Sequence, residues 1–158
     1  LGVAMAAVTR VGNLIGAGDR VGAQRAAWVA LGVGAGVMTV SAIVFVALRD
    51  EIPGIYNSDP LVLALAAGLL PIAGAFQIFD GIQVVGGGIL RGMGRTRPAA
   101  VFNLVAYYVL GLPVAYWLAF ERGMGVAGIW WGLTLGLMVA AALLVVWIGV
   151  RGPLRAKL

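Results

Sequence analysis

One carboxylic acid, Asp80, lies in the middle of a long apolar stretch of this 158-residue chain. Around it the sequence reads FQIFDGIQ from Phe76 to Gln83. An ionised acid at the centre of a membrane span costs about 2.5–3.5 kcal/mol or more, and such residues usually serve a function. Removal from water favours the neutral acid, whereas a bound cation or water favours the carboxylate. A carboxyl group balanced between these two states can carry a proton or hold Na⁺.

Two amide side chains accompany this acid. Gln77 and Gln83 lie three residues to either side of Asp80, and Gly87 follows seven residues after it. Residues at these spacings share one face of a helix. In lipid, such a polar face must turn toward other helices or a wet cavity. We therefore predict a cation-coupling site formed by Asp80, Gln77 and Gln83. The alternative is an Asp80 that only hydrogen-bonds to a neighbouring helix.

A second polar group occurs in the next apolar stretch and consists of Asn103, Tyr107 and Tyr108. Asn103 and Tyr107 are four residues apart and share a helix face. Aromatic faces attract organic cations, so these three residues are candidates for lining a substrate cavity. The alternative is polar contact between helices, which also places such residues inside membrane spans.

Other kinds of chemistry are excluded by composition. The sequence has no cysteine and no histidine, and Asp80 has no second acid in its apolar stretch. Thiol nucleophiles, histidine bases and Cys/His zinc sites are therefore absent. We predict that the chain is not an enzyme, uses no cofactor and has no metal site beyond Na⁺ at Asp80. The net charge is +5, but the basic residues flank apolar runs, so we expect no nucleic-acid partner.

The elements that position these residues must be membrane helices. The chain is 62% hydrophobic with a mean hydropathy of +1.03, which exceeds what a soluble domain can bury. A crossing helix needs about 20 residues. We predict an all-α integral membrane protein in a lipid bilayer, with residues 1–9 as the end of a helix that starts outside this chain. Four full transmembrane helices are predicted over residues 24–48, 60–90, 98–120 and 126–150.

The segments between the spans predict the orientation. Residues 10–25 are polar and rich in glycine, and Gly16, Gly18 and Gly22 approach the spacing of a nucleotide-binding loop. No strand precedes them, so we predict a surface loop instead. Loops 10–25 and 91–97 and the C-terminal tail carry nine Lys and Arg residues, whereas the opposite connections carry two. This asymmetry predicts that both loops and the tail are cytoplasmic, in a multi-pass protein of the cell membrane.

Five motifs follow one another along the chain: RVGNLIGAG at 10–18, FQIFDGIQ at 76–83, LRGMG at 90–94, YVLGLP at 108–113 and GVAGIWWG at 125–132. In this order they resemble the C-terminal lobe of the multidrug and toxic compound extrusion (MATE) family. The resemblance implies a twelve-helix, two-lobe transporter with alternating access. The chain would match the end of the eighth helix and helices nine to twelve. In the family, an acid of the tenth helix belongs to the cation-coupling region, and Asp80 falls at that motif.

The resemblance also implies what surrounds the chain. A partner acid comes from the seventh helix, which is missing here together with the N-terminal lobe. We therefore predict a fragment of a cation-coupled antiporter, driven by H⁺ or Na⁺, that exports small organic and often cationic compounds. The alternative is a four-span assembly or scaffold module that transports nothing.

Overall fold

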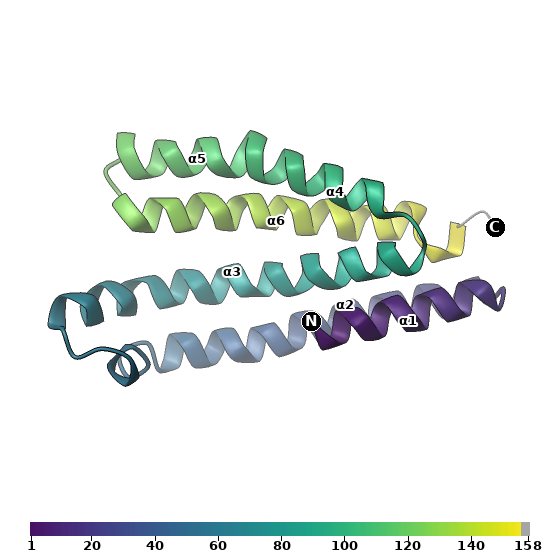
Figure 1. Ribbon diagram of the computed structural model, residues 1–158, viewed down its shortest axis with the longest axis horizontal. Helices are drawn as coiled ribbons and strands as arrows, with labels where there is room; N and C mark the ends of the chain where they lie inside the picture. The colour runs from purple at the N-terminus through teal and green to yellow at the C-terminus, as the bar shows by residue number, and fades with distance from the viewer. Residues whose placement is uncertain (156–158) are drawn as a thin grey trace.

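The computed structural model describes residues 1–155, and in them the chain forms helices that run nearly side by side (Figure 1). The α-helices are α1 Gly2–Gly16, α2 Arg20–Ala47, α3 Pro60–Gly92, α4 Thr96–Leu104, α5 Leu112–Tyr116 and α6 Gly125–Arg151. Two π-helical segments, η2 Val105–Gly111 and η3 Trp117–Glu121, continue α4 and α5, and short 3₁₀ turns occupy Pro53–Ile55 and Pro153–Arg155. No strand occurs in the described residues, which confirms the all-α prediction.

Four of these helical stretches are long and apolar enough to cross a membrane: Arg20–Ala47, Pro60–Gly92, Thr96–Glu121 and Gly125–Arg155. They confirm the prediction of four full spans. The third span is continuous because η2 and η3 join α4 and α5 into one helical rod. Helix α1 is apolar but shorter. Of the predicted basic tail, Lys157 lies outside the described residues.

The prediction of a loop over residues 10–25 was wrong. Helix α1 runs to Gly16 and α2 begins at Arg20, so the connection is only a tight turn, with Gly18 at φ 79°. The Asp19 carboxylate starts α2 by accepting a hydrogen bond from the Gly22 backbone N–H at 2.8 Å. Of the glycines here, Gly12 is a helical packing residue, since a Cβ on it would lie 3.3 Å from a backbone oxygen of α3.

Helix α3 is the central element, because it packs against α1, α2, α4 and α6. Its contact with α1 is made by backbone rather than by large side chains. A Cβ on Gly88 would lie 2.7 Å from the Ala4 carbonyl oxygen, and one on Gly92 would lie 2.7 Å from that of Val8. Small residues allow this close approach. Helices in lipid associate through such close packing, because moving apolar side chains from lipid into a helix interface gives no hydrophobic stabilisation.

A second close seam joins α6 to the third span. Three glycines at every fourth position of α6, Gly128, Gly132 and Gly136, form one side of the seam. The other side is the row Ala106, Gly111, Ala115 and Ala119. Its first step is five residues and falls in η2, where a π turn bonds residues five apart. The π segment therefore keeps this row in line with α6.

The ends of the bundle differ in charge. The α1–α2 turn, the α3–α4 turn and the end of α6 lie together at the right of Figure 1. The Arg residues of the predicted cytoplasmic group lie in these segments or within about two helical turns of them. Arg49 and Arg122 belong to the connections at the opposite end. Gln24 ties the basic end together: its amide donates to the Ile148 carbonyl oxygen at 3.3 Å and accepts from the Leu154 N–H at 3.2 Å.

Candidate functional site

Asp80 lies near the middle of α3, and its side chain is partly buried. It lines a cavity of about 400 Å³ between α3 and the facing residues of α1 and α2, among them Val3, Val37 and Met38. The other lining residues are apolar or glycine. Within residues 1–155, no hydrogen bond or ion pair reaches the Asp80 carboxylate.

Gln77 turns from the same helix toward α2. Its Oε1 accepts a hydrogen bond from the Ser41 hydroxyl at 3.3 Å. Its Nε2 is buried and has no hydrogen-bond partner in the described part of the chain, so both N–H donors of this amide are unused there. The sequence interpretation missed Ser41 as a polar partner. The only signal for it was a hydroxyl in the interior of an apolar span.

Gln83 turns the other way, toward α4. Its Nε2 donates to the Asn103 Oδ1 at 3.0 Å. Neither Gln77 nor Gln83 lines the cavity at Asp80. The three residues cover an arc of about 120° at 100° per residue, which is wide enough to face three different neighbours. The structure therefore separates the predicted set and instead joins Gln83 to Asn103, which the sequence placed in another group.

The three predicted cavity residues of the third span do lie together. Asn103, Tyr107 and Tyr108 line one open groove of about 470 Å³, together with Leu104, Leu112 and Leu133. Tyr107 and Tyr108 belong to the π segment η2, and Tyr108 is 70% exposed. The groove thus presents phenol rings and one amide. Through the Gln83–Asn103 hydrogen bond it is connected to the helix that carries Asp80.

The site offers little to a multivalent metal ion. In residues 1–155 no three His, Cys, Asp or Glu side chains gather closely enough to hold one. Asp80 is therefore a single carboxyl group in an otherwise apolar lining. Such a group can exchange a monovalent cation or a proton with its surroundings.

Comparison with known proteins agrees with this architecture. A family model described as MatE matches residues 1–117. The chain is 45% identical over 149 residues to the multidrug resistance protein NorM of Burkholderia vietnamiensis, covering 91% of this chain and 32% of that protein. It superposes on the crystal structure of the eukaryotic MATE transporter AtDTX14 with a TM-score of 0.91 and 30% identity, covering 98% of this chain and 34% of that one. An inward-facing multidrug resistance MATE transporter of the MOP superfamily shares the fold at 21% identity, with a TM-score of 0.86 over 99% of this chain and 36% of that one.

The chain thus spans about a third of the length of these relatives. The family model covers well over half of the chain, including α1 to α3 and most of the third span. These matches confirm the resemblance drawn from the five sequence motifs, and they agree with the prediction that the chain is not an enzyme. The chain belongs to the MATE family of multi-pass membrane transporters.

Proposed function

We propose that this chain is part of a cation-coupled antiporter that exports organic compounds, and that Asp80 takes up the coupling ion. The observation that carries the proposal is the carboxyl group of Asp80, which faces an apolar cavity near the middle of α3. No hydrogen bond or ion pair from residues 1–155 satisfies it. A charge left in this position is costly, so uptake of a cation or proton there changes the energy of the surrounding conformation.

Within this chain the proton is the better supported coupling ion. A proton needs only the carboxyl oxygen, whereas Na⁺ needs several oxygen ligands. The remaining lining of the cavity is apolar or glycine. Gln77 Oε1 already accepts from Ser41, and Gln83 turns toward Asn103. Na⁺ coupling would therefore require oxygen ligands from elsewhere in the protein.

The substrate side of the proposal rests on the groove at η2. Asn103, Tyr107 and Tyr108 present aromatic faces and an amide to one open space of about 470 Å³. Cations are attracted to aromatic faces by about 0.5–2 kcal/mol each, which suits flat or quaternary organic cations. The Gln83–Asn103 hydrogen bond supports a physical link between this groove and the ion site.

Coupling follows from opposite preferences for two conformations. Protonation of Asp80 would favour one orientation of the lobe, and bound substrate the other, so that each expels its counterpart. The chain spans about a third of the length of its relatives. The proposal therefore includes an N-terminal lobe and a seventh helix with a partner acid, which lie outside residues 1–158. The concentration of Arg at one end supports a cytoplasmic position for the α1–α2 turn, the α3–α4 turn and the C-terminal tail, in the cell membrane.

The test uses the protein as the cell expresses it, with any sequence that flanks residues 1–158. Export of a fluorescent organic cation is followed in vesicles under an imposed pH gradient and, separately, an imposed Na⁺ gradient. We expect Asp80→Asn to abolish gradient-driven export and Asp80→Glu to retain part of it. The matched control is Glu51→Gln, which removes an exposed carboxylate of the α2–α3 connection and should export normally.

Three outcomes separate the hypotheses. Export by Asp80→Asn at the wild-type rate would refute the coupling role. Export driven only by the Na⁺ gradient would support Asp80 as the coupling site but would identify Na⁺, not the proton, as the coupling ion. No export by the wild-type protein under either gradient would favour the non-transporting four-span module.

A further inference from the structure

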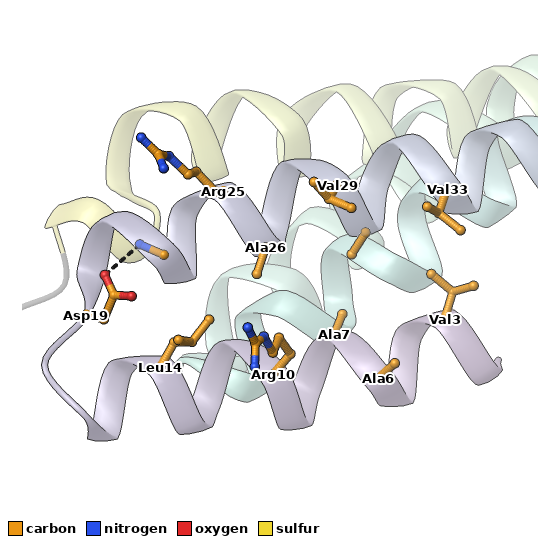
Figure 2. A pocket seen from close by; sticks show the side chains of 12 residues that line it. Val3, Ala6, Ala7, Arg10, Leu14, Asp19, Arg25, Ala26, Val29 and Val33 are labelled. Atoms are coloured by element: carbon orange, nitrogen blue, oxygen red, sulfur yellow. Dashed lines mark hydrogen bonds between the residues drawn. The ribbon is translucent and has the colours of Figure 1, made fainter.

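An apolar groove of about 570 Å³ lies between α1 and α2 (Figure 2). Its length is lined by small and branched apolar side chains, among them Ala6, Ala26, Val29 and Val33. Val29 is 65% exposed and Val33 is 49% exposed. Neither the ion site nor the substrate groove described above uses this surface, so its occupant is a separate question.

The groove is charged at one end only. Figure 2 shows Arg10 rising from α1 toward α2, whereas Arg25 extends from α2 at that same end but away from α1 and Arg10. The carboxylate of Asp19 also lines this end, but it accepts the Gly22 N–H as the cap of α2. In the part of the chain that the structure describes, neither arginine takes part in an ion pair. The end of the groove therefore has two arginines that no acid among residues 1–155 pairs.

The depth of the groove matches one leaflet of a bilayer. Leu14, Asp19 and Gly22 continue the lining beyond the arginines. From the arginines, the apolar part of the lining extends seven residues from Arg10 to Val3 on α1 and eight residues from Arg25 to Val33 on α2. At 1.5 Å per residue these lengths are about 10 and 12 Å. Half of a hydrocarbon core about 30 Å thick is about 15 Å. The arginines therefore lie at headgroup level when the apolar part lies among acyl chains.

We propose that this groove binds an anionic phospholipid of the leaflet at the basic end of the bundle. The phosphate group pairs with Arg10, the positive charge of Arg25 lies at the same end, and one acyl chain lies along Ala26, Val29 and Val33. Charge complementarity selects this occupant, since arginine pairs with phosphate through two parallel N–H bonds. Basic pockets between membrane helices are also suited to anionic headgroups. An apolar helix placed here would bury the groove but would carry no charge complementary to the two exposed arginines.

The experiment measures binding of dioleoylphosphatidylglycerol and dioleoylphosphatidylcholine to the purified protein in neutral detergent, by native mass spectrometry. The protein is taken as the cell expresses it, with its flanking sequence. We expect tighter binding of the anionic lipid, and a loss of about thirtyfold in its affinity for Arg10→Gln/Arg25→Gln. That loss is about 2 kcal/mol, at about 1 kcal/mol for each arginine. The control Arg97→Gln/Arg151→Gln removes the same charge at the same end and should bind like wild type.

Two further arms examine the acyl chain and the source of the phosphate. Ala30→Phe fills the groove without changing charge and should also weaken binding of the anionic lipid. Glycerol phosphate carries the headgroup without acyl chains and should not displace the lipid at equal concentration. The proposal is overturned if the arginine variant keeps the lipid preference, if the control loses it equally, if Ala30→Phe has no effect, or if glycerol phosphate competes equally. A wild-type protein without any preference would also overturn it, and would point to another protein segment or a second copy in the groove.

Discussion

The seam between α6 and the third span allows a quantitative test of the packing. In Gly132→Ala, the added methyl group would overlap the backbone N and Cα of Ala115. These are backbone atoms that cannot rotate away, so the two helices must separate. Overpacking of this kind costs about 1–3 kcal/mol. In Gly36→Ala, a mid-helix control in α2, the methyl group meets no atom within 4 Å.

Both variants gain about the same helix propensity from replacing glycine, up to about 1 kcal/mol. The difference between them is therefore the packing cost alone, and Gly132→Ala should be less stable than Gly36→Ala by about 1–3 kcal/mol. The assay is unfolding of the purified protein in mixed micelles of increasing denaturing detergent, followed by far-ultraviolet circular dichroism. Equal stability of the two variants would refute the close backbone seam and, with it, the alignment that η2 provides.

Two further predictions concern hydrogen bonds between helices. Gln83→Leu and Asn103→Leu should each lower the free energy of unfolding. The double variant should lower it by about 0.6 kcal/mol less than the sum of the two losses, the average for such bonds in membranes. Strictly additive losses would contradict a direct bond. Gln24→Ala should speed amide hydrogen exchange at Leu154, because it removes the hydrogen bonds of Gln24 to Ile148 and Leu154. Exchange at the α2–α3 connection should stay unchanged. Unaltered exchange at Leu154 would contradict the role of these two bonds.

Long apolar runs made the number of spans and the central depth of Asp80 predictable, because length and hydropathy alone decide them. The loop over 10–25 failed for a physical reason. Glycine is both a turn residue and a packing residue, and only the partner helix distinguishes the two uses. Gly18 has a positive φ and makes the turn, whereas Gly12 is helical and faces α3.

The π segments show a similar limit. The five-residue step from Ala106 to Gly111 is explained only by the glycine row of α6 that it faces. Sequence periodicity cannot show which residues of two helices face each other. The same holds for the polar face of α3. The polar residues of α3 were predictable, but that Gln77 turns to Ser41 and Gln83 to Asn103 depends on where α2 and α4 lie.

The central claim is that Asp80 exchanges a proton for substrate. The most direct measurement is proton release when an organic cation is added to the purified protein in weakly buffered detergent solution, recorded with a pH indicator. Wild-type protein should release protons on substrate binding, and Asp80→Asn should release markedly fewer while still binding substrate. Equal release by Asp80→Asn and wild type would contradict the account, because the exchanged proton would then come from another group.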